Sequence, residues 1–192
     1  MGASMSDNLR SYTTAIYGFD AVIQRVPADG WDAPSPCDGW NARDVVAHQI
    51  GVFDGVATMA RSGEMVMPSP PDIEGDPVSA WTASRDGLLE ALDQPDVLKR
   101  PGAYWFGTTT IDDLLAIVRY DPLAHAWDVA TAVGLQHCCS NDVAEAALVS
   151  LEPLAPMMRE HGLIGDPVEV SPDADAFTKF LGLVGRDPSL PS

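Results

Sequence analysis

Two histidines and two aspartates combine the residue types and the spacing of a metal site. Asp121, His125 and Asp128 follow one another at intervals of four and three residues, so on a helix their side chains project from one face. His48 lies in a second helical pattern, on the side that carries the apolar residues, and therefore points into the core. Helical bundles commonly build metal centres from carboxylate and histidine side chains on facing helices. The pattern predicts one divalent metal ion in the core.

The predicted ligands are His48, Asp121 and His125, while Asp128 lies behind them and orients a ring N–H of a ligand histidine. Two imidazoles and one carboxylate leave the fourth position of a tetrahedral zinc ion open, which is typical of catalytic rather than structural zinc sites. Iron or nickel would accept the same donors. A zinc ion here would lower the pKa of a bound water or thiol toward neutrality and so supply a nucleophile.

The role of Asp121 has two interpretations. Pro122 disfavours the helical state at the residue before it. Asp121 is therefore either the N-cap of a new helix, with its carboxylate bonded to backbone N–H groups, or part of a continuous, kinked helix in which the carboxylate stays free to bind. The histidines also have a structural alternative, because a core histidine is more often hydrogen-bonded than a metal ligand. A bundle without any metal thus remains a competing hypothesis.

Other side chains with chemical potential give weaker signals. His137 and His161 fall near predicted helix C-termini, where the helix dipole favours a cation. Cys37 lies in the loop before the second helix and could approach the site, but we interpret it as incidental. We interpret Trp40 as a packing residue. The aromatic segment 104–106 either lines a pocket or closes the core.

The elements that must position these residues are helices. Apolar residues recur at steps of three and four along four stretches, which predicts an amphipathic helix for each: residues 6–26, 41–62, 76–93 and 111–134. Asn41 is suited to cap the second helix, Asp44 is an acid in its first turn, and Gly63 ends it. The sequence therefore presents His48 and His125 on separate helices.

Shorter elements follow or connect these helices. In the stretch 94–110, two prolines and a glycine precede the β-prone residues 104–110, which predict a short hairpin or an extended flap. Residues 141–162 predict a helix bent or divided by two prolines, and residues 174–184 predict a last short helix. With so few strand signals, the fold class is all-α, with at least four helices.

Composition limits the partners and the compartment. The 192 residues are 46% hydrophobic, which suits one compact domain over residues 1–192. A net charge of -17 should repel nucleic acid and anionic membranes. We find neither a signal peptide nor an apolar run long enough to span a bilayer, and three cysteines without C-x-x-C spacing indicate reduced thiols, so we expect a cytoplasmic protein. A second methionine at position 5 suggests that residues 1–4 are vector-derived.

Three motifs together resemble a known family. Residues 36–48 run PCDGWNARDVVAH, residues 121–134 run DPLAHAWDVATAVG, and residues 180–188 run FLGLVGRDP. The first two resemble the paired metal motifs of the mycothiol-dependent maleylpyruvate isomerase N-terminal domain. The third is similar to the tail of related actinobacterial metal-binding proteins of the DinB-like superfamily.

The resemblance implies a DinB-like four-helix bundle with additional C-terminal helices. It also implies a divalent metal, usually zinc, held by His48, Asp121 and His125. The isomerase has glutamate where this chain has Asp121, so the third ligand departs from the family pattern. The isomerase carries a further domain that helps to bind the thiol, and we expect a chain of 192 residues to be too short to include it.

The resemblance leads to two functional hypotheses, since a fold alone does not transfer a reaction. The first is a metal-dependent transferase or isomerase in which the metal activates a small thiol such as mycothiol for attack on a small electrophile. The alternative is a non-catalytic metal-binding protein of stress response or metal handling. The expected partners are therefore a small-molecule thiol and an electrophile. A homodimer through helix faces is compatible with the pattern.

Overall fold

The computed structural model describes residues 5–190 except residues 65, 67, 74, 105, 106 and 138. The expectations for residues 1–4 and for residues 105 and 106 of the aromatic segment therefore lie outside the described residues. The elements, in chain order, are α1 (Asp7–Ile23), α2 (Ala42–Ser62), α3 (Pro77–Leu92), a 3-10 turn η1 (Val97–Lys99), β1 (Pro101–Tyr104), β2 (Gly107–Thr110), α4 (Ile111–Val118), α5 (Tyr120–Ala132), α6 (Asn141–Leu151), α7 (Ala155–Glu160) and α8 (Ala176–Leu183).

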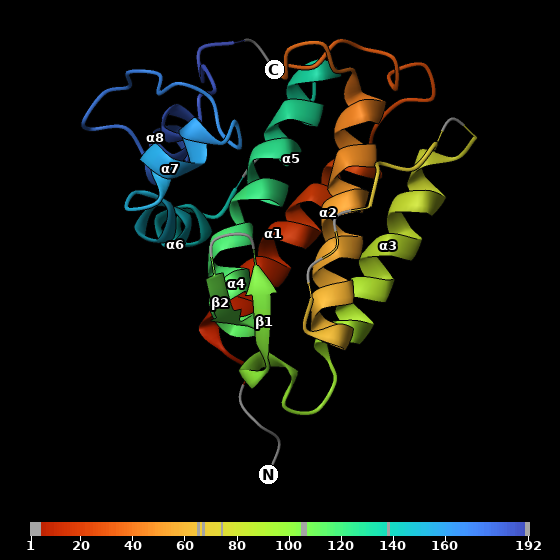
Figure 1. Cartoon of the computed structure of the whole chain (residues 1–192). Coiled ribbons are helices and arrows are strands. Elements are labelled where there is room, and N and C mark those ends of the chain that lie inside the picture. Colours follow the sequence, from red (N-terminus) through yellow and green to blue (C-terminus); the bar gives the residue numbers. More distant parts are fainter. Residues whose placement is uncertain are drawn as a thin grey trace.

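Four long helical stretches form a bundle (Figure 1). α1 packs along α4 and α5, while α2 packs against both α3 and α5. α4 and α5 are separated at Arg119 alone, so the two together make the fourth member of the bundle. α6, α7 and α8 lie outside the bundle beside α5 (Figure 1). This arrangement confirms the expected all-α four-helix bundle with additional C-terminal helices.

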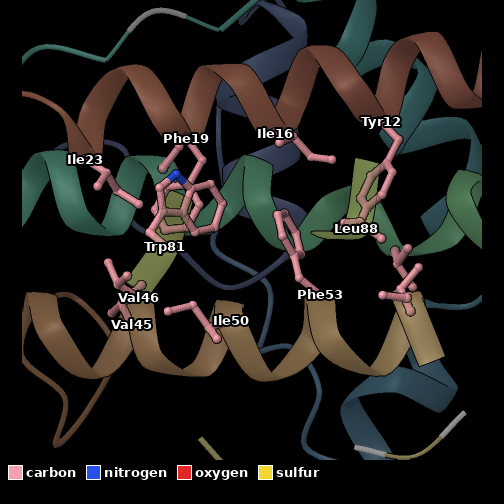
Figure 2. Close-up of a cluster of buried hydrophobic side chains, with 14 of the residues drawn as sticks. Tyr12, Ile16, Phe19, Ile23, Val45, Val46, Ile50, Phe53, Trp81 and Leu88 are labelled. Carbon is pink, nitrogen blue, oxygen red and sulfur yellow. The ribbon is translucent and has the colours of Figure 1, made fainter. Parts of the chain in front are cut away.

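The bundle core is built around Trp81 of α3 (Figure 2). Its ring meets Phe19 of α1 edge to face at a centroid distance of 4.7 Å and lies 5.1 Å from Phe53 of α2. Its indole N–H donates to Asp20 at 2.9 Å, which satisfies the polar atom of a fully buried side chain. α1 contributes the residues that its periodicity predicted, among them Tyr12 and Phe19, each with no exposed area.

Local signals set both ends of α2, the helix that carries His48. The Asn41 side chain accepts from the backbone N–H of Asp44, and the Asp44 carboxylate accepts from the backbone N–H of Asn41. This reciprocal capping box satisfies two backbone donors that would otherwise lack a partner. At the other end Gly63 adopts a left-handed backbone conformation and caps the helix. Both predicted boundaries of α2 are confirmed.

Asp121 lies inside α5 and does not cap it. The N-cap position is Arg119, which makes no side-chain capping bond, and the helix begins at Tyr120. Pro122 thus falls in the first turn, where a backbone N–H has no partner within the helix and its absence costs nothing. Of the two interpretations of Asp121, the structure supports the one in which its carboxylate is not used by the backbone.

The flap is a two-stranded hairpin. β1 and β2 pair antiparallel with Pro101 opposite Thr110 and Tyr104 opposite Gly107. The β-prone residues 104–110 predicted a hairpin here, and its first strand begins earlier, at Pro101. Beyond α5 the proline-containing stretch divides into α6 and α7, and α8 follows. Among the described helices, each is either too short or too polar to cross a membrane.

Candidate metal centre

His48 on α2 faces Asp121 and His125 on α5. Nε2 of His48 lies 3.5 Å from Oδ2 of Asp121, and Nε2 of His125 lies 3.4 Å from Oδ1 of the same carboxylate. One donor atom from each of the three residues lies within 4.8 Å of the other two. The two imidazole rings meet edge to face with centroids 5.0 Å apart. The structure therefore brings together the three residues that the sequence predicted as ligands.

Asp121 is a buried carboxylate with one unused oxygen. The residue is 6% exposed, and its Oδ2 atom is shielded from solvent without a hydrogen-bond partner among the described residues. Burial alone would raise the pKa of the Asp121 carboxyl, but the nearby His125 and His48 rings hold it well below its usual range. The group is therefore negatively charged, and a buried charge is stable only with a partner.

Asp128 fixes the other side of the His125 ring. Nδ1 of His125 lies 2.8 Å from Oδ2 of Asp128, one turn further along α5. Burial alone would lower the pKa of His125, but the carboxylates of Asp121 and Asp128 raise it well above its usual range. An ionised carboxylate only accepts hydrogen bonds, so Nδ1 carries the proton that faces Asp128. Nε2 faces Asp121 and would coordinate a metal ion after losing its own proton. Asp128 thus contacts the ring nitrogen of His125 that faces away from Asp121, as the sequence argument expected.

Asp128 also binds groups from two distant segments. Nε of Arg186 donates to Oδ1 at 3.2 Å, and Nη2 donates to Oδ2 at 2.8 Å, so the guanidinium holds both carboxylate oxygens. The Cys37 thiol donates to Oδ2 at 3.1 Å. Burial raises the pKa of Asp128, yet His125 and Arg186 together lower it to about 2. Asp128 is therefore ionised at neutral pH.

A cavity of about 570 Å³ opens over the three candidate ligands. Its walls come from the segment before α2, from α5 and from the turns that follow α7 and α8, with Tyr120, Leu163 and Ile164 among the lining residues. This volume falls within the roughly 300–1,000 Å³ of small-molecule sites. The His48 side chain, 30% exposed, connects the cavity to the buried carboxylate of Asp121.

Trp40 covers the histidines and borders a second hollow. Its ring centroid lies 5.0 Å from that of His48 and 6.3 Å from that of His125. Trp40 and His48 also line a hollow of about 460 Å³ on the side of Pro70 and Pro71. The loop between α2 and α3, which contains Pro70 and Pro71, therefore reaches the neighbourhood of the site.

The three residues fit a divalent metal ion. Two imidazole nitrogens and a carboxylate oxygen are donors that zinc accepts, and the unpartnered Oδ2 of Asp121 would gain a partner. Cys37, His125 and Asp128 form a second group of potential donors. The Arg186 guanidinium already holds Asp128 in that group, so a cation there would meet a positive charge. The first group is the better candidate.

Three interpretations of single residues are wrong. Cys37 is not incidental, because its thiol contacts Asp128. Trp40 is 37% exposed and covers the candidate site rather than packing in the core. His137 is not a cation at a helix end, because burial lowers its pKa to about 4 and leaves the ring neutral at pH 7. His161 does lie at a helix end, with Nδ1 2.9 Å from the carbonyl oxygen of Met157.

Arg186 has no predicted role in the sequence argument. It belongs to the motif over residues 180–188, but it is 58 residues from Asp128 in the chain. The residue type was a usable signal, because an arginine is the side chain best suited to grip a carboxylate at two points. Its partner could be identified only from the tertiary structure.

Comparison with known proteins relates these features to a family. The sequence model of the family described as the mycothiol maleylpyruvate isomerase N-terminal domain matches residues 13–130. The matched part contains the three candidate ligands and Asp128, and it ends before Arg186.

Two similar proteins and one solved structure extend the comparison. Uncharacterized proteins MT0763 and Rv0738, from two strains of Mycobacterium tuberculosis, are each 28% identical over 192 residues, which cover 94% of this chain and 100% of the relative. The crystal structure of a mutant of the mycothiol-dependent maleylpyruvate isomerase matches with a TM-score of 0.52 at 15% identity, covering 83% of this chain and 72% of that chain. This structural likeness confirms the DinB-like fold.

Proposed function

This chain belongs to the family of the mycothiol maleylpyruvate isomerase N-terminal domain, and from that premise we propose that it binds one divalent metal ion, zinc, with His48, Asp121 and His125. When bound there, the metal would lower the pKa of a low-molecular-weight thiol, mycothiol or a close analogue, and the thiolate would attack a small electrophile. The reaction is a thiol transfer or a thiol-assisted isomerisation.

The observation that carries the proposal is the buried Oδ2 atom of Asp121, which accepts no hydrogen bond from the described residues. Proteins rarely leave a buried charged oxygen without a hydrogen bond, because desolvation of that atom is costly. Here the oxygen lies 3.5 Å from a histidine nitrogen, at the floor of a cavity of about 570 Å³. A cation shared with the two imidazoles would account for this atom, for the convergence of α2 and α5 and for the access from the cavity.

The side chains around the candidate metal site would have different roles in the reaction. A zinc ion with an open position lowers the pKa of a thiol ligand toward neutrality. Asp121 and the two histidines would hold the ion, and Asp128 accepts the Nδ1 proton of His125 so that Nε2 is the nitrogen that would coordinate it. The apolar walls of the cavity, which include Ile164, would hold the electrophile against the thiol.

Metal analysis tests the first half of the proposal. After reconstitution with Zn²⁺ and removal of free metal, we expect about one zinc ion per wild-type chain and a loss of most of it in His48→Ala and His125→Ala. His161→Ala removes an exposed imidazole that does not line the cavity and should leave the zinc content unchanged. Wild-type protein without stoichiometric metal, or a His125→Ala variant that keeps it, would refute the metal site.

A thiol-consumption assay tests the second half. Zinc-loaded protein is mixed with mycothiol and a panel of small electrophiles, and the loss of free thiol is followed. We expect at least one electrophile to react faster with wild type than with His48→Ala. If zinc is bound but no electrophile shows this difference, the chain is instead a non-catalytic metal-binding protein.

A further inference from the structure

Arg186 uses its hydrogen-bond donors inside the protein. Nε and Nη2 hold the two oxygens of Asp128, Nη2 also lies 3.4 Å from the Cys37 sulfur, and Nη1 donates to the backbone carbonyl of Val184 at 3.0 Å. A guanidinium has five N–H donors, and these contacts engage every one of its nitrogens. Although Arg186 lines the cavity, it is therefore directed at Asp128 rather than offered to a substrate.

Backbone hydrogen bonds at the end of α8 hold Arg186 in position. At the end of α8 the N–H of Arg186 bonds to the carbonyl of Leu181 at 2.9 Å, and the N–H of Gly185 bonds to the carbonyl of Gly182 at 3.3 Å. These two bonds are the Schellman pattern, in which a left-handed residue ends a helix, and Gly185 has the required φ of 84°. The position of the guanidinium is thus set by the end of a helix and not by a loose tail.

A second segment holds this helix end in place. The N–H of Gly165 bonds to the carbonyl of Val184 at 3.2 Å, and a Cβ atom on Gly185 would lie only 2.6 Å from the Cα atom of Gly165. Arg159 of α7 donates to the carbonyl of Leu183 at 2.8 Å. The two glycines pack backbone against backbone, which fixes the segment that lines the cavity and ends in Arg186.

Asp128 consequently receives donors from three sides. Arg186 reaches it from the C-terminal segment, Cys37 from the loop before α2, and His125 from its own helix. With the guanidinium removed, a fully buried carboxylate would lose the partner that holds both oxygens and offsets its charge. Its orientation toward Nδ1 of His125 would then no longer be fixed.

We propose that Arg186 is a positioning residue of the metal centre, which acts through Asp128 to hold Nε2 of His125 toward the metal, with Cys37 closing the third side of the carboxylate. This inference rests on the proposed function. It assigns a role to a residue beyond the part of the chain that matches the family model, residues 13–130. In this protein the C-terminal helices therefore complete the site that α2 and α5 begin.

Zinc affinity of Arg186 variants tests the inference. Measured by competition with a chromophoric chelator, the zinc dissociation constant should rise roughly 10-fold to 100-fold in Arg186→Gln, the range typical for loss of a group that supports a metal ligand. Arg186→Lys keeps the charge but not the two-point geometry and should recover part of the affinity. Arg85→Gln is the matched control, because it breaks a comparable contact of 2.6 Å to Asp20 far from the cavity.

Two further measurements separate positioning from general stability. The visible absorption of the Co²⁺-loaded protein reports the geometry around the metal, and it should change in Arg186→Gln but not in Arg85→Gln. In a double-mutant cycle, Arg186→Gln should add little to the loss of affinity already caused by Asp128→Asn, because both act through one carboxylate. If Arg186→Gln does not fold, the Arg186→Lys spectrum and affinity still decide the question.

The outcomes distinguish this inference from the proposed function. Wild-type protein that binds no stoichiometric zinc refutes the proposed function itself. Tight zinc binding by wild type with an unchanged dissociation constant and Co²⁺ spectrum in both Arg186 variants overturns the positioning role alone. Fully additive losses in the double-mutant cycle would also overturn it, since Arg186 would then act independently of Asp128.

Discussion

Nε2 of His48 and Oδ2 of Asp121 lie 3.5 Å apart across the bundle and do not form a hydrogen bond. The histidine is 30% exposed toward the cavity, whereas the aspartate side chain is 8% exposed. The two side chains therefore lead from the solvent-accessible cavity to a buried charge. A substrate in the cavity could contact a cation bound between the two atoms. This relationship makes Asp121 the most informative ligand to change.

Asp121→Glu and Asp121→Asn should have opposite outcomes. Glutamate keeps the negative charge and a carboxylate oxygen, so we expect stoichiometric zinc binding to persist. Asparagine is neutral and should weaken zinc binding at least about 10-fold, because carboxylates are among the ligands of catalytic zinc sites and amides are not. The measurement is zinc titration against a chromophoric chelator, with the exposed Asp142→Asn as control. Equal affinity in Asp121→Asn and wild type would exclude Asp121 from the ligand set.

Trp40 and Trp81 should differ sharply in their effect on stability. Trp81 has no exposed area and donates a hydrogen bond to Asp20, so Trp81→Ala should cost about 3–5 kcal/mol of unfolding free energy. Trp40 is 37% exposed over the two histidines, so Trp40→Ala should cost less than about 1 kcal/mol. Urea unfolding of both variants gives the comparison. A similar cost for the two would mean that Trp40 packs as a core residue after all.

Acid should destabilise the protein through His137. This ring lines a separate cavity of about 220 Å³ between α1, α5 and the loop before α6, and burial lowers its pKa to about 4. In the unfolded chain the pKa is about 6.5. Above pH 6.5 neither state binds the proton, but as the pH falls from about 6.5 to about 4 only the unfolded chain takes it up, so stability is progressively lost.

The unfolding free energy of the wild-type protein should therefore be about 2 kcal/mol lower at pH 5 than at pH 7. His137→Phe keeps a ring against Phe177 but cannot take up the proton, so its unfolding free energy should fall less between pH 7 and pH 5. Urea unfolding at both pH values measures this, and His161→Gln, which replaces an exposed histidine, should retain the wild-type fall. The same fall in His137→Phe as in wild type would show that another group titrates.

The parts of the site that depend on local signals could be predicted from the sequence. The Asn41 cap and Gly63 stop define α2, and the four-residue spacing of Asp121 and His125 requires only that a helix forms. The state of Asp121 could not be predicted, because a shift of the helix start by one or two residues changes it from a cap to a free carboxylate. The structure resolves this by starting α5 at Tyr120.

The parts that depend on long-range contacts could not be predicted. Cys37 and Arg186 lie 149 positions apart in the chain, yet they contact each other and both bind Asp128. Their approach depends on the end of α8 and on the close packing of Gly165 against Gly185, neither of which leaves a periodic pattern. Trp40 was misjudged for a related reason: the position before a helix cap suits both a packing residue and a residue that covers a cavity.

Gly185→Ala tests whether the backbone at the end of α8 maintains the metal centre. The residue has a φ of 84°, and a Cβ atom there would lie 2.6 Å from the Cα atom of Gly165, so the two segments would have to separate. Gly134→Ala is the matched control, because Gly134 has a φ of 66° but open space around the Cβ position. Both variants should lose about 1–2 kcal/mol for the left-handed conformation.

Gly185→Ala should lose more than Gly134→Ala, because it adds a clash between two backbones. It should also raise the zinc dissociation constant, since separation of the segments withdraws Arg186 from Asp128, whereas Gly134→Ala should bind zinc as wild type does. Urea unfolding and zinc competition on the same preparations measure both quantities. A Gly185→Ala protein that is strongly destabilised yet binds zinc with wild-type affinity would show that the metal centre does not depend on the C-terminal segment, and Arg186 would then be an ordinary structural ion pair.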